Sequence, residues 1–149
     1  MVSLKNVLSI IILSSMITAC DTQDATPSNN INEVTGSIQR MDPRLDALIP
    51  PNTNIEKLAD GFVFLEGPVW HQATGQLFFS DVRNNASYVW SENNGVIDFI
   101  NPVFNGDTNG RSVGSNGLTI DRNGCIIMLE HGYRRISRTC QNEPIQREV

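Results

Sequence analysis

One acid in an apolar setting is the first candidate for chemistry in this chain of 149 residues. Glu66 stands in the stretch FLEGPVW, beside the turn-prone pair Gly67-Pro68 and with apolar residues on both sides. A buried carboxylate without a partner is costly, so such a group is normally exposed, paired or bound to a metal ion. Its oxygens would suit a hard or borderline divalent cation such as Ca²⁺, Mg²⁺ or Mn²⁺. An ion pair with an arginine and a capped turn are the alternatives.

Glu66 has a counterpart, because the sequence repeats itself at an offset of 116 minus 66, or 50, residues. Residues 66–84 align with residues 116–133 when one gap is placed in the turn, so that Glu66 falls on Asn116. Each copy reads as a strand, a tight glycine turn, an apolar strand, a polar turn and a third strand. In the first copy a further strand, VIDFI, follows. Repeats of about 40 to 50 residues with about four short strands are typical of propeller blades. The sequence therefore predicts an all-β fold of about two blades.

Blade geometry would bring the candidate residues to one opening. The first strand of a blade lines the central channel, and its start lies on the same face as the turn after the second strand. Glu66 and Asn116 are therefore predicted to point toward the channel axis. The turns SDVRNN and EHGYRR would form the rim, where His131 and Arg134 are candidate contacts.

Three nearby residues are given structural roles instead. His71 lies in the turn HQATG, at the opposite face, and is predicted to be a solvated turn residue. Trp70 and Trp90 are predicted to lie in the core. None of the three enters the candidate site.

Residues 1–19 have the layout of an export signal, with Lys5 before an apolar run and small residues at the end. The ending ITAC resembles the lipobox of bacterial lipoproteins, which predicts that Cys20 is lipidated. A plain signal peptide and an uncleaved anchor are the alternatives. Residues 20–40 are polar and are predicted to be a flexible tether. The domain, 41–149, would then lie on the periplasmic side of a membrane and begin with DPRLDALIPPN, predicted to be an ordered loop rather than a helix.

The net charge limits the classes of binding partner that we expect. The chain has 16 acidic and 11 basic residues, and the mature charge is 10 minus 16, or −6, once Lys5 is removed with the signal. This acidic balance gives no reason to expect a nucleic acid as a partner. The membrane would be contacted only through the lipid on Cys20.

The two remaining cysteines, Cys125 and Cys140, flank a predicted β-hairpin. A turn centred on Gly132-Tyr133 makes facing positions sum to 265, as 125 and 140 do. The two sulfur atoms would then be within reach of a disulfide, which persists in an oxidising compartment. The alternative is a pair of buried free thiols, because a register slip of one residue would place them on opposite faces.

Most of the predicted domain resembles one known family. The motifs EGPVW, FSD, NG, D-x-x-G and EHG-x-RR occur in order within roughly residues 41–140. Together they resemble the gluconolactonase branch of the senescence-marker-protein / gluconolactonase / luciferin-regenerating-enzyme family. The resemblance implies a six-bladed β-propeller that hydrolyses lactones with a divalent metal in its central channel.

The resemblance also implies roles for individual residues. Glu66 matches the metal-binding glutamate of the family, and Asn116 matches a channel asparagine that contacts the substrate. His131 and Arg134 are added as rim contacts with the substrate. The implied cofactor is Ca²⁺, with Zn²⁺, Mg²⁺ or Mn²⁺ as alternatives, and the implied substrate is a sugar lactone bound by a monomer.

The length of the chain departs from the family pattern. Six blades of about 45 residues need roughly 270 residues, whereas residues 41–149 provide 109. The expectation is therefore the N-terminal portion of a propeller, with the general base and further metal ligands expected beyond Val149. A metal-dependent lactonase seen in part is the preferred reading. A non-catalytic lipid-anchored binding module and an inactive fragment are the alternatives.

Overall fold

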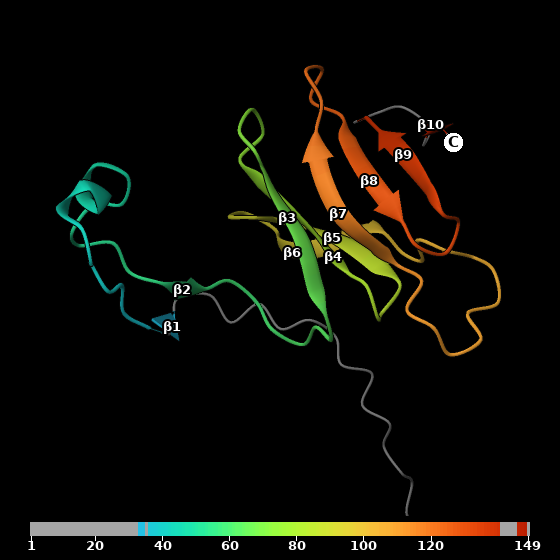
Figure 1. Cartoon of the computed structure of the whole chain (residues 1–149), viewed down its shortest axis with the longest axis horizontal. Coiled ribbons are helices and arrows are strands. Elements are labelled where there is room, and N and C mark those ends of the chain that lie inside the picture. Colours follow the sequence, from blue (N-terminus) through green and yellow to red (C-terminus); the bar gives the residue numbers. More distant parts are fainter. Residues whose placement is uncertain (1–32, 35, 141–145, 149) are drawn as a thin grey trace, which may run out of the picture.

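The structure, a computed structural model, describes residues 33–34, 36–140 and 146–148. Regular structure in this part of the chain is almost entirely antiparallel β-strand, as the sequence predicts (Figure 1). A short 3₁₀-helix, η1 (Pro43–Ala47), lies between the first two strands. The strands are β1 (Glu33–Val34), β2 (Glu56–Lys57), β3 (Leu65–His71), β4 (Gln76–Asp81), β5 (Ala86–Ser91), β6 (Gly95–Ile100), β7 (Ser115–Ile120), β8 (Ile126–Glu130), β9 (Arg135–Thr139) and β10 (Gln146–Glu148).

Two four-stranded sheets form the body of the described chain. Strands β3 to β6 make the first sheet in chain order, and β7 to β10 make the second, so each sheet is an antiparallel meander. The first hairpin of each sheet closes with a glycine, Gly75 or Gly124, at a φ of 64° or 80°. These positive φ angles favour glycine, which explains why both copies of the repeat carry one in this turn.

The two sheets share the same strand register. Leu65 pairs with Asp81 in the first sheet, and Ser115 pairs with Glu130 in the second. Each first strand is then interrupted by an irregularity, located between Glu66 and Val69 in β3 and between Ser115 and Leu118 in β7. The sequence repeat thus corresponds to two sheets with the same strand order and register, and with an irregularity at the same place in the first strand.

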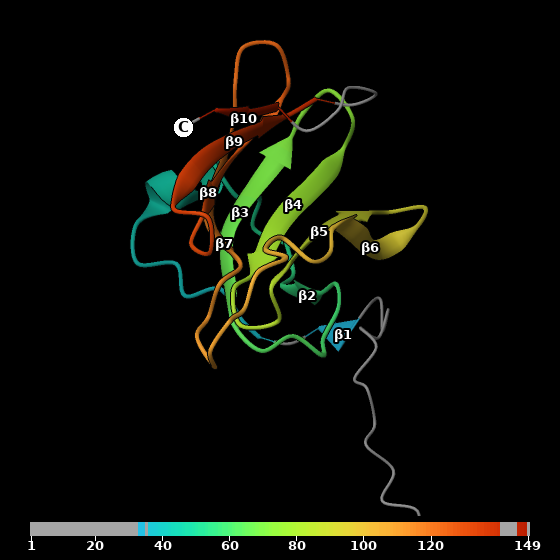
Figure 2. The same cartoon turned by 90° about the vertical axis from the view of Figure 1, so that its right-hand side faces the viewer.

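The sheets pack against each other through their first strands. Strands β3 and β7 lie side by side in both views (Figures 1 and 2), and β7 also contacts β4. Phe78 and Val89 of the first sheet meet Ile126 of the second in a shared apolar core. On the other side of the first sheet, a second core is covered by Phe62. That core contains Phe79, Ala86 and Tyr88.

Gly67 permits the close approach of the two first strands. Its φ is 56°, and a Cβ at this position would lie 2.7 Å from the backbone nitrogen of Leu118 and would also collide with the carbonyl oxygen of Asn116. Backbone atoms cannot move aside as a flexible side chain can, so only glycine fits between β3 and β7. The glycine of the EGP motif is therefore a packing requirement.

The segment before the sheets differs from the sequence prediction. The predicted ordered loop contains η1, because the Asp42 carboxylate caps its start by accepting from the Arg44 N–H at 2.8 Å and Pro43 suits the first turn. Within residues 20–40, predicted to be a tether, Glu33–Val34 pairs with Glu56–Lys57. Residues 1–32, with the predicted signal and Cys20, lie outside the described residues. Within the described part, no helix has the length and apolar character needed to cross a membrane.

Two predicted positions are wrong. Trp70 was expected in the core but is 48% exposed, because β7 covers the other side of β3 and leaves the indole uncovered. His71 was expected in solvent but is 8% exposed, because its ring lies between the tip turns of the two sheets. Trp90 is half-buried and packs against the core that Phe62 covers.

Candidate functional site

Three of the predicted site residues line one groove. Asn116 of β7 lies there with His131 and Arg134, which belong to the turn between β8 and β9. The groove has a volume of about 580 Å³ and opens at the end of the second sheet. Both turn residues are exposed, whereas Asn116 is half-buried. The remaining lining residues are Gly117, Leu129, Glu130, Arg135 and Ile136.

Glu66 lies in a different hollow. It is half-buried and lines an apolar pocket of about 290 Å³ with Phe62, Leu77 and Trp90. The sequence placed Glu66 and Asn116 at one opening, but their side chains line separate hollows even though their strands are neighbours. Among the described residues, the Glu66 carboxylate forms no ion pair with an arginine.

An ion pair forms the floor of the groove. Glu130 is 4% exposed, and its carboxylate accepts a hydrogen bond of 2.7 Å from Nε of Arg135. The Arg135 guanidinium also lies over the ring of Tyr133, 3.9 Å from its centroid. A second guanidinium nitrogen, Nη2, is buried without a hydrogen-bond partner among the described residues. Arg135 is therefore a site residue that sequence reasoning missed, although the motif EHG-x-RR contains it.

The long loop before β7 braces the rim. The Asn85 side chain binds the backbone of Phe104 twice, through bonds of 2.7 and 2.9 Å. The Phe104 ring then meets Tyr133 edge-on, with centroids 4.7 Å apart, and fills the space over Gly132. A side chain on Gly132 would collide with this ring, so glycine in the EHG motif lets the loop close over the turn. The rim residues are therefore held by packing from outside their own hairpin.

The acid of the FSD motif has a structural task. Asp81 is fully buried and accepts hydrogen bonds from the backbone N–H groups of Val63 and Phe64 at 2.9 and 3.0 Å, and from the Asn84 side chain at 2.8 Å. Buried carboxylates need such partners. In the repeat Asp81 corresponds to Glu130, so the second strand of each sheet ends in a buried acid. Backbone N–H groups and Asn84 donate to Asp81, whereas Arg135 donates to Glu130.

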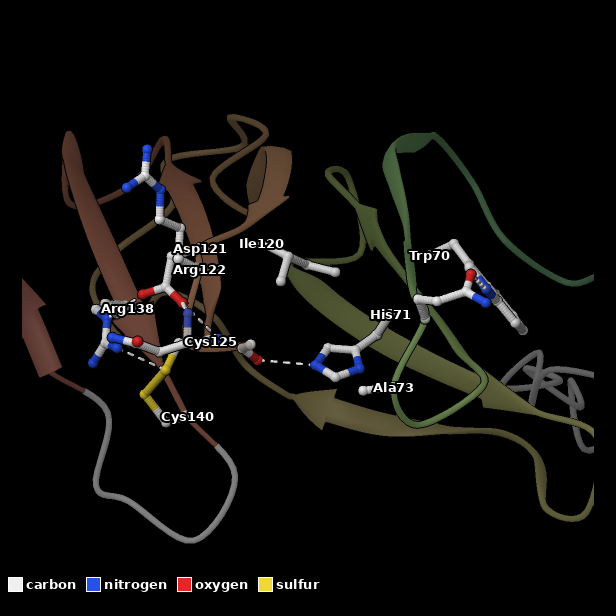
Figure 3. A pocket seen from close by; sticks show the side chains of 12 residues that line it. Trp70, His71, Ala73, Ile120, Asp121, Arg122, Cys125, Arg138 and Cys140 are labelled. Atoms are coloured by element: carbon white, nitrogen blue, oxygen red, sulfur yellow. Dashed lines mark hydrogen bonds and ion pairs between the residues drawn. A yellow bond between two sulfur atoms is a disulfide. The ribbon is translucent and has the colours of Figure 1, made fainter.

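A larger cavity lies at the opposite end of the sheets, between their tip turns (Figure 3). Its volume is about 800 Å³, and Trp70, His71, Asp121 and Arg138 contribute side chains to its wall. The Cys125 N–H and the Arg138 guanidinium bind Asp121 at 2.9 and 2.8 Å, and they lower the pKa of its carboxyl below the ordinary value of 3.8.

A disulfide joins Cys125 to Cys140 beside this cavity, with their Cα atoms 4.3 Å apart. The register of β8 and β9 agrees with the predicted one, since Ile126 pairs with Thr139 and 126 plus 139 is also 265. Arg138 donates to the Cys125 sulfur at 2.8 Å, so the bridge and the Asp121 pair share one arginine.

The described residues do not form a complete metal site. Across them, no three histidine, cysteine, aspartate or glutamate side chains converge as ligands would. Ca²⁺ takes about six to eight oxygen ligands, which come from several carboxylates together with carbonyl groups and waters. Glu66 is the only carboxylate among the residues that line its pocket, so the described residues do not fit the implied cation.

This chain is similar to known proteins that are described as gluconolactonases. No protein-family model matches the chain. Among curated proteins, a gluconolactonase from Zymomonas mobilis subsp. mobilis is 34% identical over 125 residues, which cover 80% of this chain and 34% of that protein. An X-ray structure of a protein provisionally assigned as a gluconolactonase is 30% identical, with a TM-score of 0.48, over 59% of this chain and 28% of that chain. The chain thus spans about a third of the length of these relatives.

Proposed function

We infer from its homology to gluconolactonase that this chain belongs to the gluconolactonase family, and we propose that it takes part in the hydrolysis of a lactone. The homology supports lactone hydrolysis at the level of the family. One observation supports a place for the substrate in this chain: Asn116 of β7 lines one groove together with His131 and Arg134, which lie in the turn between β8 and β9. We assign the substrate to that groove.

The groove suits the polar atoms of a sugar lactone. The Asn116 amide can donate to a ring or carbonyl oxygen and accept from a hydroxyl. Arg134 is exposed at the rim, and Nη2 of Arg135 is buried without a partner among the described residues. Donors aimed at a carbonyl oxygen stabilise the negative charge that develops there when water attacks. Ring opening gives a hydroxy acid, whose carboxylate is a ligand that arginine binds well.

Glu66 lies outside this groove. The family resemblance assigns it to a divalent cation, for which Ca²⁺ is the first candidate, but the residues described do not complete such a site. We therefore expect no turnover of glucono-1,5-lactone by this chain alone with Ca²⁺, Zn²⁺ or Mn²⁺. Robust metal-dependent turnover that Glu66→Gln abolishes would show that fewer groups suffice than we infer.

Binding of gluconate, the hydroxy acid formed from that lactone, tests the groove directly. We expect Asn116→Ala to weaken gluconate binding by the full chain about tenfold, the equivalent of about 1.4 kcal/mol and of one hydrogen bond. Asn123→Ala is the matched control, because Asn123 is exposed in a tip turn at the other end of the sheet. Titration calorimetry measures both. Equal affinities for the two variants would exclude the groove as the binding site.

A second pair of variants tests the rim. Arg134→Gln should weaken gluconate binding, because it removes a cation facing the expected carboxylate. Arg122→Gln removes the same charge from the opposite tip turn and should leave binding unchanged. If both changes weaken binding equally, the net charge of the chain explains the effect and the rim contact is wrong.

A further inference from the structure

The two cysteines of the disulfide have different surroundings. Cys125 directly precedes β8 and is 3% exposed, whereas Cys140 directly follows β9 and is half-buried. Both line the cavity of about 800 Å³ between the tip turns of the two sheets (Figure 3). The walls of this cavity belong to described strands and turns of both sheets. A small molecule that enters the cavity therefore meets Cys140 as the more accessible of the two cysteines.

A guanidinium group lies against the sulfur of the less accessible cysteine. Nη2 of Arg138 donates to Sγ of Cys125 at 2.8 Å, while Nε of the same side chain donates to the Asp121 carboxylate, also at 2.8 Å. Asp121 in turn accepts from the N–H groups of Cys125 and Asn123, at 2.9 and 2.8 Å. The carboxylate thus holds the arginine in a fixed position with its second donor on the sulfur.

This asymmetry gives the disulfide a preferred direction of reaction with thiols. In thiol–disulfide exchange, a thiolate attacks one sulfur and the other sulfur leaves as a thiolate. Access decides which sulfur can be attacked, and a stabilised thiolate leaves faster. A positive charge beside a sulfur favours its thiolate form. Attack at Cys140, with Cys125 as the leaving group beside Arg138, satisfies both conditions.

We propose that Cys140 is a modification site at which low-molecular-weight thiols enter the disulfide, with Arg138 as the positioning residue for the departing Cys125 thiolate. The thiolate of the small molecule forms a bond to Sγ of Cys140, and the bond between Cys140 and Cys125 breaks. Cys125 keeps the electron pair of that bond. Arg138 keeps its proton, because a guanidinium donates a hydrogen bond without deprotonating.

The same contact makes the modification reversible. Arg138, held by Asp121, keeps the Cys125 thiolate beside Cys140, where it can attack the mixed disulfide and expel the small thiol. A second small thiol instead attacks the sulfur of the bound one, so that Cys140 leaves as a thiolate and the disulfide of the small molecule is released. Backbone pairing between β8 and β9, which begins next to the bridge at Ile126 and Thr139, holds the two strands together in every state.

The site of attack is tested on the purified full-length chain with glutathione under native conditions. N-ethylmaleimide added after short exposures caps the free thiols. Trypsin then cleaves after Arg122, Arg134 and Arg138, which places Cys125 and Cys140 on separate peptides, both distinct from the peptide of Cys20. Mass spectrometry should find glutathione on Cys140 and maleimide on Cys125. Glutathione mainly on Cys125, or equally on both, would overturn the proposal, as would a bridge that opens only after unfolding in urea.

The rate of opening by glutathione tests the role of Arg138. Arg138→Gln should slow it about three- to tenfold, because the leaving thiolate loses its charge partner. Arg122→Gln, which removes the same charge from an exposed position in the wall of the same cavity, should leave the rate unchanged. A merely destabilised variant would expose the bridge and react faster, so the expected change has the opposite sign. In concentrated urea the rates should become equal. An unchanged or faster rate for Arg138→Gln in the folded chain would contradict the assigned role.

Discussion

The Nε2 atom of His71 lies 3.0 Å from the carbonyl oxygen of Gly124, a residue 53 positions further along the chain (Figure 3). Nδ1 of the same ring accepts from the N–H of Thr74, so Nε2 carries the proton and donates to that carbonyl. The bond joins the tip turn of the first sheet to the tip turn of the second. A histidine that reads as a solvated turn residue thus connects the two copies of the repeat.

Replacing this histidine should destabilise the contact between the sheets. His71→Ala removes the bond and leaves the Gly124 carbonyl partly buried, so we expect a loss of about 1 to 3 kcal/mol in the free energy of unfolding. Gln72→Ala, a change at the exposed neighbour, is the control and should cost much less. Urea unfolding followed by tryptophan fluorescence measures both. Equal stabilities would mean that the contact contributes nothing.

The disulfide should contribute more to the free energy of unfolding than the His71 hydrogen bond does. Cys125 and Cys140 close a loop with a sequence separation of 15, for which the chain-entropy model gives about 3 kcal/mol. Cys140→Ser under oxidising conditions should therefore lower stability by about that amount, and wild-type protein with dithiothreitol should behave similarly. A thiol count on the unreduced, denatured mature protein checks the premise, since two reactive thiols at these positions would rule the bridge out.

Asp121 should make stability depend on pH at the acid end. Its pKa is lowered in the folded state by the Cys125 N–H and by Arg138, so its contribution is complete above the ordinary value of 3.8 and is lost as the pH falls through the lower, folded pKa. Asp121→Asn should lower the free energy of unfolding at pH 7 and flatten its fall below about pH 4.

Asp107→Asn is the control for this change, because Asp107 is exposed in the long loop and accepts a local N–H, that of Asn109. Urea unfolding at pH 7, 4 and 3 gives the slopes. If Asp121→Asn and wild type lose stability in parallel below pH 4, the carboxylate is not the group responsible.

Membrane attachment should depend on Cys20, which lies outside the described residues. We propose that this cysteine carries the lipid, so Cys20→Ser should release the protein from the membrane fraction into the soluble periplasmic or culture fraction. Cys125→Ser is the control, because it also replaces a cysteine by serine but leaves the predicted lipidation site. Continued sedimentation of the Cys20→Ser protein with membranes would contradict the lipoprotein prediction.

The repeat was readable from the sequence because it is a local pattern. Alternating apolar runs, a glycine in each tip turn and a fixed spacing define strands and hairpins without reference to the rest of the molecule. The pairing of 125 with 140 followed from the same local geometry, since a hairpin turn fixes which positions face each other. Glu66 and Asn116 were correctly matched as equivalent positions in two copies.

Only the tertiary structure decided what those positions face, because that depends on how one sheet covers the next. The packing of β7 on one side of β3 buries His71 and exposes Trp70, although the two residues are adjacent in the chain. The same packing puts Glu66 and Asn116 in separate hollows. The sequence by itself determined the strands, their turns and the correspondence between the two copies of the repeat. Contacts between residues about 50 positions apart determined which side chains are buried and the shape of the site.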